Sequence, residues 1–289
     1  MTVTPEQART ATNRHYEQAP EYFAAFLDTR MKYSSGLYTD IAMSLEDAQT
    51  AKLHFVARSL GVTQGGRLLD IGCGWGSLIL FMAAEYGVQV TGVTPSEPQA
   101  EFIARRAESL GVSHLVGTRL GSFTSIDVGG GYDYATMLGS IVHMPDRRAA
   151  LTKTYRALNQ GGRLYLSESC FRNESFYTEF NSRPGTKHVT ENIFGFADMV
   201  PLSTLVSGAE DAGFSLVDLT DLTAHYHRTI EEWERRAVAN ADEIERIAPG
   251  SVEPLVRYLQ TANAGWGYTT KHYAITAERS RLGPEVPRA

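Results

Sequence analysis

Residues 68–76 read Leu-Leu-Asp-Ile-Gly-Cys-Gly-Trp-Gly, an apolar run that enters a glycine-rich loop. The run predicts a short buried strand over 67–71, and residues 77–86 predict the helix that follows. Glycines at positions 72, 74 and 76 let the backbone approach a ligand closely, and the next helix offers its N-terminal N–H groups to negative charge. The stretch therefore predicts a small-molecule site, with a tight turn that binds nothing as the alternative.

Predicted strands and helices alternate outward from this loop. Upstream, Ser44 begins a helix that ends at Leu60, with the spacing of a capping box, and Gly61 is its expected C-cap. Downstream, the pattern predicts strands over 89–94, 132–137, 163–167, 214–219 and 271–277, and helices over 97–110, 146–158, 202–212 and 230–247. This alternation is typical of an α/β fold with a doubly wound, mostly parallel sheet.

The remaining segments organise the chain around that core. Aromatic residues at helical spacing over 5–30 predict amphipathic helices, so residues 1–60 are expected to form an N-terminal helical cap. Residues 61–170 form the expected ligand-binding core, and the aromatic-rich segment 171–200 is expected to be a helical insertion that covers the substrate. Residues 201–280 complete the core sheet and helices, and 281–289 are a tail.

Composition narrows the class of ligand. The 289 residues carry a net charge of −6, which disfavours binding to a phosphate backbone, so we expect no nucleic-acid partner. The chain has two cysteines, Cys73 and Cys170, which are too few for a disulfide framework or a metal site. We therefore expect the protein in the reducing cytoplasm. The sequence contains no run of about 18 apolar residues, so we expect no membrane span. A small-molecule substrate is favoured, for a monomer or a homo-oligomer.

Motifs at five places share a family pattern. They are Tyr33-Ser34-Ser35, residues 45–52 (Leu-Glu-Asp-Ala-Gln-Thr-Ala-Lys), residues 70–76, residues 90–99 (Val-Thr-Gly-Val-Thr-Pro-Ser-Glu-Pro-Gln), and His225-Tyr226 before Trp233. Over residues 15–280 the chain resembles the cyclopropane-fatty-acid synthase and mycolic-acid cyclopropane synthase family of class I methyltransferases. The resemblance implies a Rossmann-like fold with a seven-stranded sheet and S-adenosylmethionine as the cofactor.

The resemblance also implies the cofactor contacts. They would come from Tyr33, Ser34, Asp70, Gly72, Gly74, Gly76, Thr94, Pro95, Gln99, Ser122, Phe123 and Leu138. Many methyltransferases of this fold hold the ribose with an acidic residue at the end of the second strand, where this chain has Thr94. Gln99 is expected to supply the acceptor oxygen instead. The adenine is expected over residues 121–123, although Phe123 is equally well explained as a core residue.

The family's chemistry is the methylation of an alkene. The resemblance implies that the π bond attacks the methyl group, that a carbocation forms, and that a bound bicarbonate takes the proton that closes a cyclopropane. The family's four bicarbonate ligands, Cys, Glu, His and Tyr, correspond here to Ser35, Val142, Ser167 and Tyr226. Three of the four are replaced, which makes bicarbonate and cyclopropane formation doubtful.

We therefore expect methyl transfer to an alkene carbon of a lipophilic molecule that bears a prenyl or terpenoid group, through a carbocation that loses a proton or cyclises. This would place the chain in a specialised-metabolism branch of the family. The alternatives are an N-methyltransferase acting on an alkaloid amine, a fatty-acyl methylase or cyclopropane synthase, and a protein that binds the cofactor without catalysis.

The final proton needs an acceptor, and Tyr226, Glu168 and His143 are the candidates. Tyr226 matches the family position, whereas strand alternation can turn Glu168 away and His143 is also explained as an ordinary residue at a helix start. The expected substrate-lining residues are Tyr22, Ser35, Val142, Phe171, Phe194 and Trp266. For most aromatic residues of this set, packing of helices over the sheet is the alternative explanation.

Overall fold

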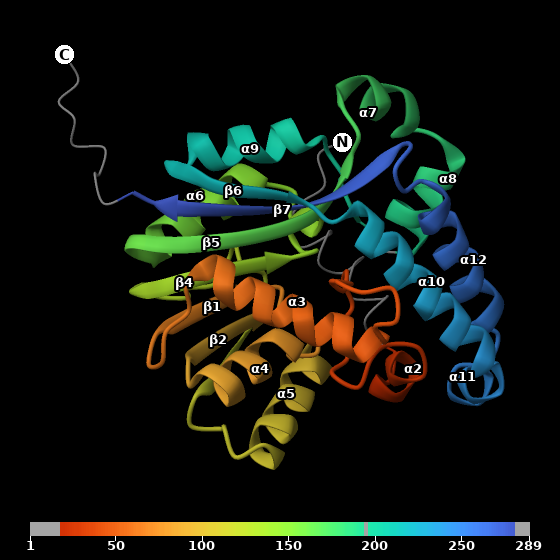
Figure 1. Ribbon diagram of the computed structural model, residues 1–289, viewed down its shortest axis with the longest axis horizontal. Coiled ribbons are helices and arrows are strands. Elements are labelled where there is room, and N and C mark those ends of the chain that lie inside the picture. The colour runs from red at the N-terminus through yellow and green to blue at the C-terminus, as the bar shows by residue number, and fades with distance from the viewer. Residues whose placement is uncertain (1–17, 194–195, 281–289) are drawn as a thin grey trace.

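A computed structural model describes residues 18–193 and 196–280. Its seven-stranded sheet has the order β3-β2-β1-β4-β5-β7-β6 (Figure 1). The strands are β1 (Arg67–Ile71), β2 (Gln89–Thr94), β3 (Val116–Leu120), β4 (Tyr132–Leu138), β5 (Leu158–Phe171), β6 (Phe214–Asp221) and β7 (Thr270–Arg279). Only β7 among them runs antiparallel to its neighbours. The predicted α/β class with a mostly parallel seven-stranded sheet is confirmed.

Helices cover both faces of the sheet. They are α2 (Pro20–Ala24), α3 (Leu45–Leu60), α4 (Ser77–Tyr86), α5 (Glu97–Ser109), α6 (Arg147–Ala157), α7 (Glu174–Phe180), α8 (Pro184–Lys187), α9 (Leu202–Asp211), α10 (Thr223–Ala239), α11 (Ala241–Ile247) and α12 (Val252–Ala264), with a 3-10 turn η1 (Ile141–His143) and a π-helical turn η2 (His188–Ile193). Helices α3, α4 and α5 lie on one face, and α6 and α9 lie on the other (Figure 1). The result is a three-layer, doubly wound arrangement.

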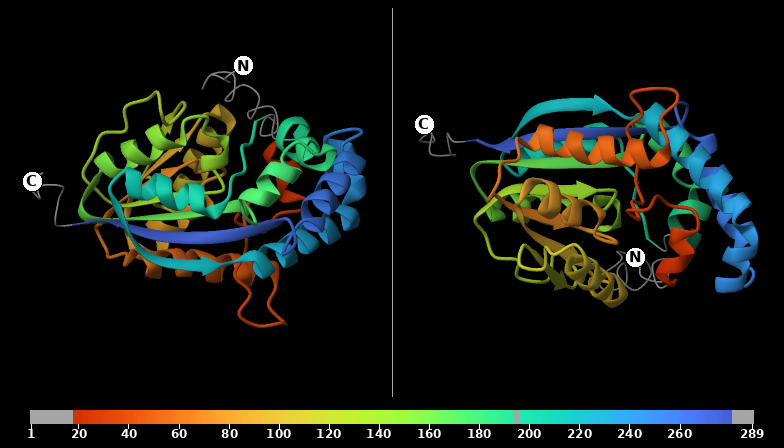
Figure 2. Two further views of the ribbon diagram at one scale, coloured as in Figure 1. Left: turned by 90° about the horizontal axis from the view of Figure 1, so that it is seen from above. Right: turned by 60° about the horizontal axis from the view of Figure 1, so that its bottom comes forward.

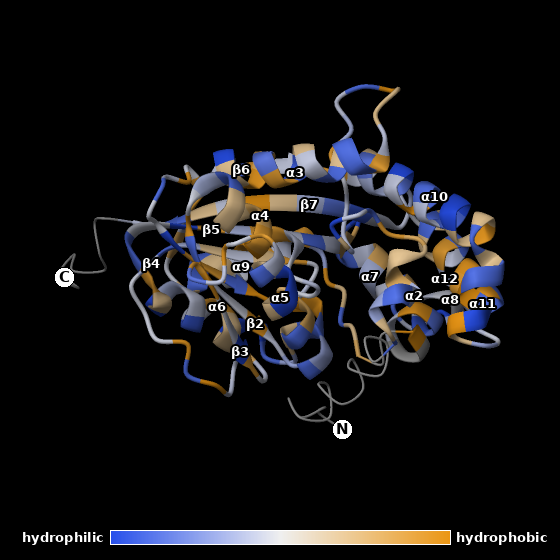
Figure 3. Ribbon diagram, turned by 90° about the horizontal axis from the view of Figure 1, so that it is seen from below, coloured by the Kyte–Doolittle hydropathy of each residue, from blue (hydrophilic) through white to orange (hydrophobic). Residues whose placement is uncertain are grey.

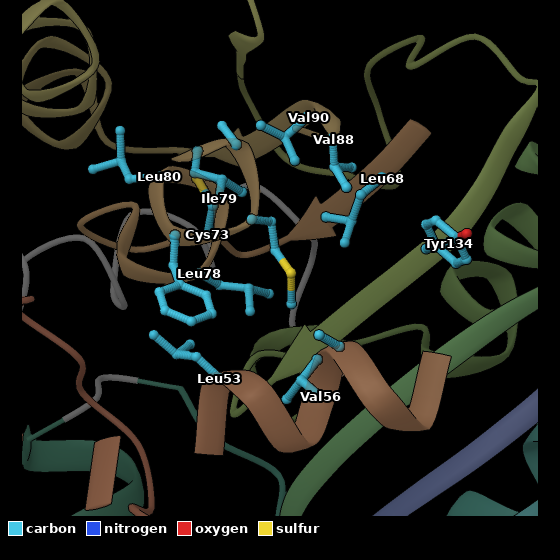
Figure 4. Close-up of a cluster of buried hydrophobic side chains, with 14 of the residues drawn as sticks. Leu53, Val56, Leu68, Cys73, Leu78, Ile79, Leu80, Val88, Val90 and Tyr134 are labelled. Atoms are coloured by element: carbon cyan, nitrogen blue, oxygen red, sulfur yellow. The ribbon is translucent and has the colours of Figure 1, made fainter. Parts of the chain in front are cut away.

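Strand alternation explains why both faces are apolar. Leu68 of β1 points into the cluster formed with α3, α4 and α5, whereas its neighbour Leu69 points into the cluster formed with α6 and α9. Figure 4 shows Leu53 and Val56 of α3 facing the side chains of α4 across the first cluster. Because parallel strands are buried on both sides, they appear in the sequence as continuous apolar runs.

Helix ends follow the predicted capping. Ser44 Oγ accepts a hydrogen bond from the Asp47 N–H at 3.1 Å, and Gly61 closes α3 in the left-handed conformation at φ 67°. Both expectations are confirmed.

A group of helices lies beyond the carboxyl ends of the parallel strands. Figures 1 and 2 show α2, α8, α10, α11 and α12 gathered at that end. Helices such as α10 and α12 carry both hydrophobic and hydrophilic residues (Figure 3), and their apolar sides form a third core cluster with α2, which includes Phe23, Trp233 and Leu259. This helical group places aromatic side chains over the edge of the sheet where ligands bind in such folds.

Several predicted boundaries are wrong. The expected single helix over 230–247 is two helices, since α10 begins at Thr223 and ends before Asn240, whose side chain donates to the Ala25 carbonyl at 2.6 Å. Strand β3 and helix α12 were not predicted, and β5 extends from Leu158 to Phe171 instead of 163–167. The described part of segment 171–200 holds α7, α8 and η2.

The expected helices over 5–30 are described only from residue 18 on, where α2 is found. The division into cap, core, insertion and tail stays a prediction. No helix in the described ranges combines the length and the apolar character that a bilayer crossing requires.

Candidate active site

The glycine loop after β1 is held open by its backbone. The N–H groups of Gly72 and Cys73 both donate to the Val93 carbonyl at 3.0 Å, which ties the loop to the end of β2. Gly72 has φ 82°, and a Cβ atom there would lie 2.4 Å from Ser140 Cβ. At Gly74, with φ 53°, a Cβ would meet nothing within 4 Å, so this face of the loop is open. Gly72 thus packs closely against Ser140, and the predicted close approach of a ligand to the loop stays a prediction.

A cavity lies over this loop, at the carboxyl ends of β1, β2 and β4. Ten of the predicted cofactor and catalytic residues line it: Tyr33, Gly72, Gly74, Thr94, Pro95, Gln99, Ser122, Phe123, Leu138 and His143. Five predicted residues of these two kinds lie outside its lining, namely Ser34, Asp70, Gly76, Glu168 and Tyr226. Residues far apart in the sequence thus meet around one cavity, while their individual roles stay predictions.

A polar pair lies at the end of β2. The Thr94 hydroxyl donates to Gln99 Oε1 at 2.6 Å, and both residues are buried. Ser96 caps α5 through the Gln99 N–H at 3.5 Å, which fixes Gln99 in the first helical turn. Gln99 therefore lines the cavity with its amide oxygen bound to Thr94, and its predicted contact to a ribose stays a prediction.

Phe123 has two contacts that fix the opposite wall. The Lys153 ammonium lies 5.1 Å from the centre of the Phe123 ring and donates to the Phe123 carbonyl at 2.7 Å. The ring belongs to the core cluster on the α6 and α9 side and also lines the cavity. Phe123 therefore serves the core and the cavity wall together.

Lys32 is a buried charged residue that interacts with two buried acids, Asp28 and Asp70. Asp28 Oδ1 accepts from the Lys32 N–H at 2.7 Å, and Asp70 Oδ1 accepts from the Thr136 hydroxyl at 2.7 Å. Burial lowers the pKa of Lys32 and raises the pKa of Asp70, while their mutual attraction opposes both changes. Lys32 lines the cavity and was missed by the sequence reasoning, because nothing in a single lysine after Met31 signals burial.

Ser34 lies behind that wall. Its Oγ accepts a hydrogen bond from Lys52 Nζ at 2.8 Å, and burial, together with the charge of Lys32, lowers the pKa of Lys52 well below its usual range. Ser34 is thus a partner of a buried lysine in this structure.

The cavity fits S-adenosylmethionine. Helix α4 begins at the loop with no side-chain cap among the described residues, so its first N–H groups suit a carboxylate. Within the same described part of the chain, Ser77 Oγ and Trp75 Nε1 are buried without a hydrogen-bond partner, and both residues line the cavity. The open face at Gly74 and the Thr94–Gln99 pair complete a set suited to an amino acid at one end and a nucleoside at the other.

A second constellation, the Tyr226–His272 cluster, consists of Ser169, Tyr226, Trp266 and His272. The ring centre of Tyr226 lies 4.6 Å from that of His272 and 4.9 Å from that of Trp266. Trp233 contacts both the cluster and a residue of the cavity lining. Its ring centre lies 6.0 Å from the ring centre of Tyr226 and 5.1 Å from that of Tyr33. His272 was missed as a site residue, because strand pairing over 103 residues brings it to Ser169 and no local pattern reports that pairing.

The other two proton-acceptor candidates, Glu168 and His143, are hydrogen-bonded to backbone groups of the protein. Glu168 Oε1 accepts from the Ser169 N–H at 2.9 Å and Oε2 from the Val142 N–H at 3.5 Å, so the carboxyl group holds the turn η1. Burial raises the pKa of Glu168 to about 7. His143 Nδ1 donates to the Phe196 carbonyl at 2.7 Å, and burial lowers its pKa.

The predicted substrate residues are dispersed. Tyr22 is buried in the third core cluster, where it packs on Phe23 and Phe26. The Ser35 hydroxyl donates to the Gly36 carbonyl at 2.8 Å. Phe171 packs on Tyr177 with ring centres 5.6 Å apart, away from the cavity lining. Phe194 lies outside the described residues.

These positions do not fit a bicarbonate. The Ser35 hydroxyl is committed to a carbonyl, and Val142 offers only methyl groups. At the remaining replaced position, Ser167 offers a neutral hydroxyl in place of an imidazole.

The fold, the glycine loop and the polar pair after β2 define a Rossmann-like methyltransferase. The chain belongs to the mycolic acid cyclopropane synthetase family, whose model matches residues 4–273. The cyclopropane synthase MmaA2 of Mycobacterium tuberculosis has a similar structure, with a TM-score of 0.87 and 23% identity, covering 93% of this chain and 98% of that one. The predicted family and enzyme class are confirmed, and S-adenosylmethionine is the cofactor of this class.

Curated relatives bear lipid-related names. A sphingolipid C9-methyltransferase of Komagataella phaffii is 30% identical over 249 residues, covering 80% of this chain and 49% of that protein. Cyclopropane mycolic acid synthase 3 of M. tuberculosis is 27% identical over 254 residues, covering 85% of this chain and 88% of that protein. The chain thus spans about half the length of the sphingolipid methyltransferases it matches.

Proposed function

We propose that this chain methylates an alkene carbon of a lipophilic small molecule that bears a prenyl or terpenoid group. Bound S-adenosylmethionine supplies an electrophilic methyl group on a sulfonium. Gly72, Gly74 and the start of α4 would hold its amino-acid end, and Thr94 and Gln99 its ribose. The acceptor would lie toward the Tyr226–His272 cluster, and its cation would lose a proton or close a ring.

The observation that carries this proposal is the make-up of the Tyr226–His272 cluster, whose side chains supply aromatic rings, two hydroxyls and an imidazole. Aromatic faces stabilise a carbocation and exclude water. An ammonium acceptor would instead favour a buried carboxylate, and Glu168 is engaged with the backbone of η1. These features support carbon over nitrogen as the acceptor atom.

An unsaturated acyl chain is the second candidate acceptor, favoured by the names of the relatives, a sphingolipid C9-methyltransferase and a cyclopropane mycolic acid synthase. An acyl alkene would use the same aromatic surroundings, so only the acceptor panel separates the two.

The test is an acceptor panel with methyl-tritiated S-adenosylmethionine. The purified chain is incubated with farnesol, a prenylated indole, vesicles of dioleoyl phosphatidylglycerol, and a secondary benzylic amine. Label on a carbon of farnesol or the prenylated indole is expected, and NMR locates the new methyl group. Label on vesicle lipid alone selects the acyl acceptor, and label on the amine alone contradicts carbon methylation.

A further inference from the structure

His272 is held rigidly at the junction of two strands and a helix. It lies on β7 opposite Ser169 of β5, and its side chain is 1% exposed. Directly opposed residues of antiparallel strands share one face, so the two side chains meet, with 3.3 Å between His272 Nδ1 and Ser169 Oγ. The His272 N–H donates to Thr223 Oγ1 at 3.0 Å, and its carbonyl accepts from the Leu222 N–H at 2.8 Å. Backbone and ring are therefore fixed from three sides.

Among the described residues, the other ring nitrogen of His272 is one of several buried polar atoms without a hydrogen-bond partner, as is Trp266 Nε1 of the same cluster. Over the described ranges 18–193 and 196–280, His272 Nε2 is buried and has no hydrogen-bond partner. Buried polar atoms are nearly always paired, so this nitrogen points to a group that binds there during function. The ring packs edge to face on Tyr226, which aromatic contacts connect through Trp233 to Tyr33 of the cofactor cavity.

Resting on the methyl transfer proposed above, we infer that Nε2 of His272 accepts the proton lost by the methylated alkene. The π electrons form the new carbon–methyl bond while the bond from that methyl group to the sulfonium sulfur breaks, which leaves S-adenosylhomocysteine and a cation on the neighbouring carbon. The electrons of an adjacent C–H bond then form a new C=C bond, and the proton passes to Nε2. The imidazolium gives this proton to water after the product leaves.

The charges around the ring keep it ready to accept. Burial, followed by the charge of Lys52, lowers the pKa of His272 to about 3, and Asp221 opposes this change. The imidazole is therefore neutral at physiological pH. With Nδ1 facing Ser169 Oγ, a proton on Nδ1 leaves the lone pair on Nε2. A low pKa also favours release of the captured proton.

A pair of ammonium probes tests this role without an acceptor substrate. Protonated dodecyldimethylamine carries one N–H, and dodecyltrimethylammonium carries none. With the chain saturated with S-adenosylhomocysteine, calorimetry should show the tertiary ammonium binding about tenfold more tightly, the value of one charge-assisted hydrogen bond. In His272→Phe this preference should disappear while affinity for S-adenosylhomocysteine is kept.

Two matched variants control the comparison. His54→Phe changes a half-buried histidine that packs on Phe81, and it should keep the tenfold preference. Tyr226→Phe should also keep it. Loss of the preference in Tyr226→Phe together with its retention in His272→Phe would overturn the assignment and make the Tyr226 phenol the acceptor. Absence of any preference in the unmodified chain would also overturn it.

Product analysis gives a second readout on any panel member that is methylated. His272→Phe, and the smaller His272→Gln if the first variant fails to fold by circular dichroism, should still transfer label but convert most product from alkene to alcohol, because water captures the cation. An unchanged alkene fraction in the variant contradicts the inference. If no member of the acceptor panel is methylated but the preference for the tertiary ammonium is found, the proposed function is rejected and His272 is still a hydrogen-bond acceptor.

Discussion

Replacing the buried carboxyl group of Glu168 should change stability in a pH-dependent way. Glu168 is 2% exposed, and its oxygens accept only from backbone N–H groups of Ser169, Val142 and Ile141, with Arg147 as the nearby positive charge. Burial outweighs these contacts and raises its pKa from 4.5 to about 7. The folded chain therefore binds this proton more strongly than the unfolded chain does.

The sign and size follow from that difference. A carboxyl group whose folded pKa is raised stabilises the fold most below its unfolded pKa of 4.5, and the unfolding free energy falls as the pH rises through about 7. The full loss above pH 7 is about 3 kcal/mol. Glu168→Gln does not titrate and keeps one acceptor oxygen, which suits the 2.9 Å bond from Ser169, while the 3.5 Å contact to Val142 is lost at a cost of about 1 kcal/mol.

Glu168→Gln should therefore be about 2 kcal/mol more stable than the unmodified chain at pH 8 and slightly less stable at pH 5. Urea denaturation followed by circular dichroism at both pH values measures this. Glu253→Gln, at an exposed position of α12, is the control and should show no crossover. The same stability difference at pH 5 and pH 8 would refute the reasoning.

Two further predictions concern the residues expected to bind the cofactor, and a third concerns bicarbonate. In Gly72→Ala the new Cβ would lie 2.4 Å from Ser140 Cβ at φ 82°, so the unfolding free energy should fall by about 3–5 kcal/mol. Gly74→Ala should lower the unfolding free energy by only about 1–2 kcal/mol, yet it should weaken the binding of S-adenosylhomocysteine. Equal losses of stability in the two variants would contradict this. Gln99→Leu, which removes the partner of Thr94, should weaken that binding about 10- to 100-fold by calorimetry, and unchanged affinity would remove Gln99 from the site. Depleting bicarbonate should leave the methylation rate unchanged, and a rate restored by added bicarbonate would show that an anion is used.

Local sequence patterns were sufficient for the centre of the fold. The apolar run over 68–71 and the glycines at 72, 74 and 76 specify strand, loop and the start of a helix within a dozen residues, and Ser44 and Gly61 mark the ends of α3 by side-chain and backbone chemistry alone. Strand β3 escaped because it is an edge strand that pairs only with β2 and leaves Leu120 52% exposed, so it lacks a buried apolar run. Its identity depends on a neighbour and not on its own residues.

Two omissions differ in kind. Helix α12 had a readable signal, since Leu255, Tyr258 and Leu259 have the spacing of one buried helix face. His272 and Lys32 had none, because their burial results from packing against segments far away in the chain. Candidate residues drawn from motifs thus include most of the cavity lining named above, together with Tyr226 and Trp266 of the second cluster, whereas His272 became visible only in the three-dimensional arrangement.

The hydrogen bonds and protonation of the buried acids bear on the kind of intermediate that this site can hold. Among the described residues, the buried carboxylic acids are Asp28, Asp70 and Glu168, and each has an oxygen hydrogen-bonded to the protein itself. Burial raises the pKa of all three, so their neutral forms are favoured more than in water. A free carboxylate beside a carbocation would capture it as an ester, whereas aromatic rings and a neutral imidazole stabilise it or remove its proton. Tyr226, Trp266 and His272 supply aromatic faces and a neutral imidazole, and the neighbouring Glu168 is held by backbone N–H groups, which is the arrangement that the proposed cationic path needs.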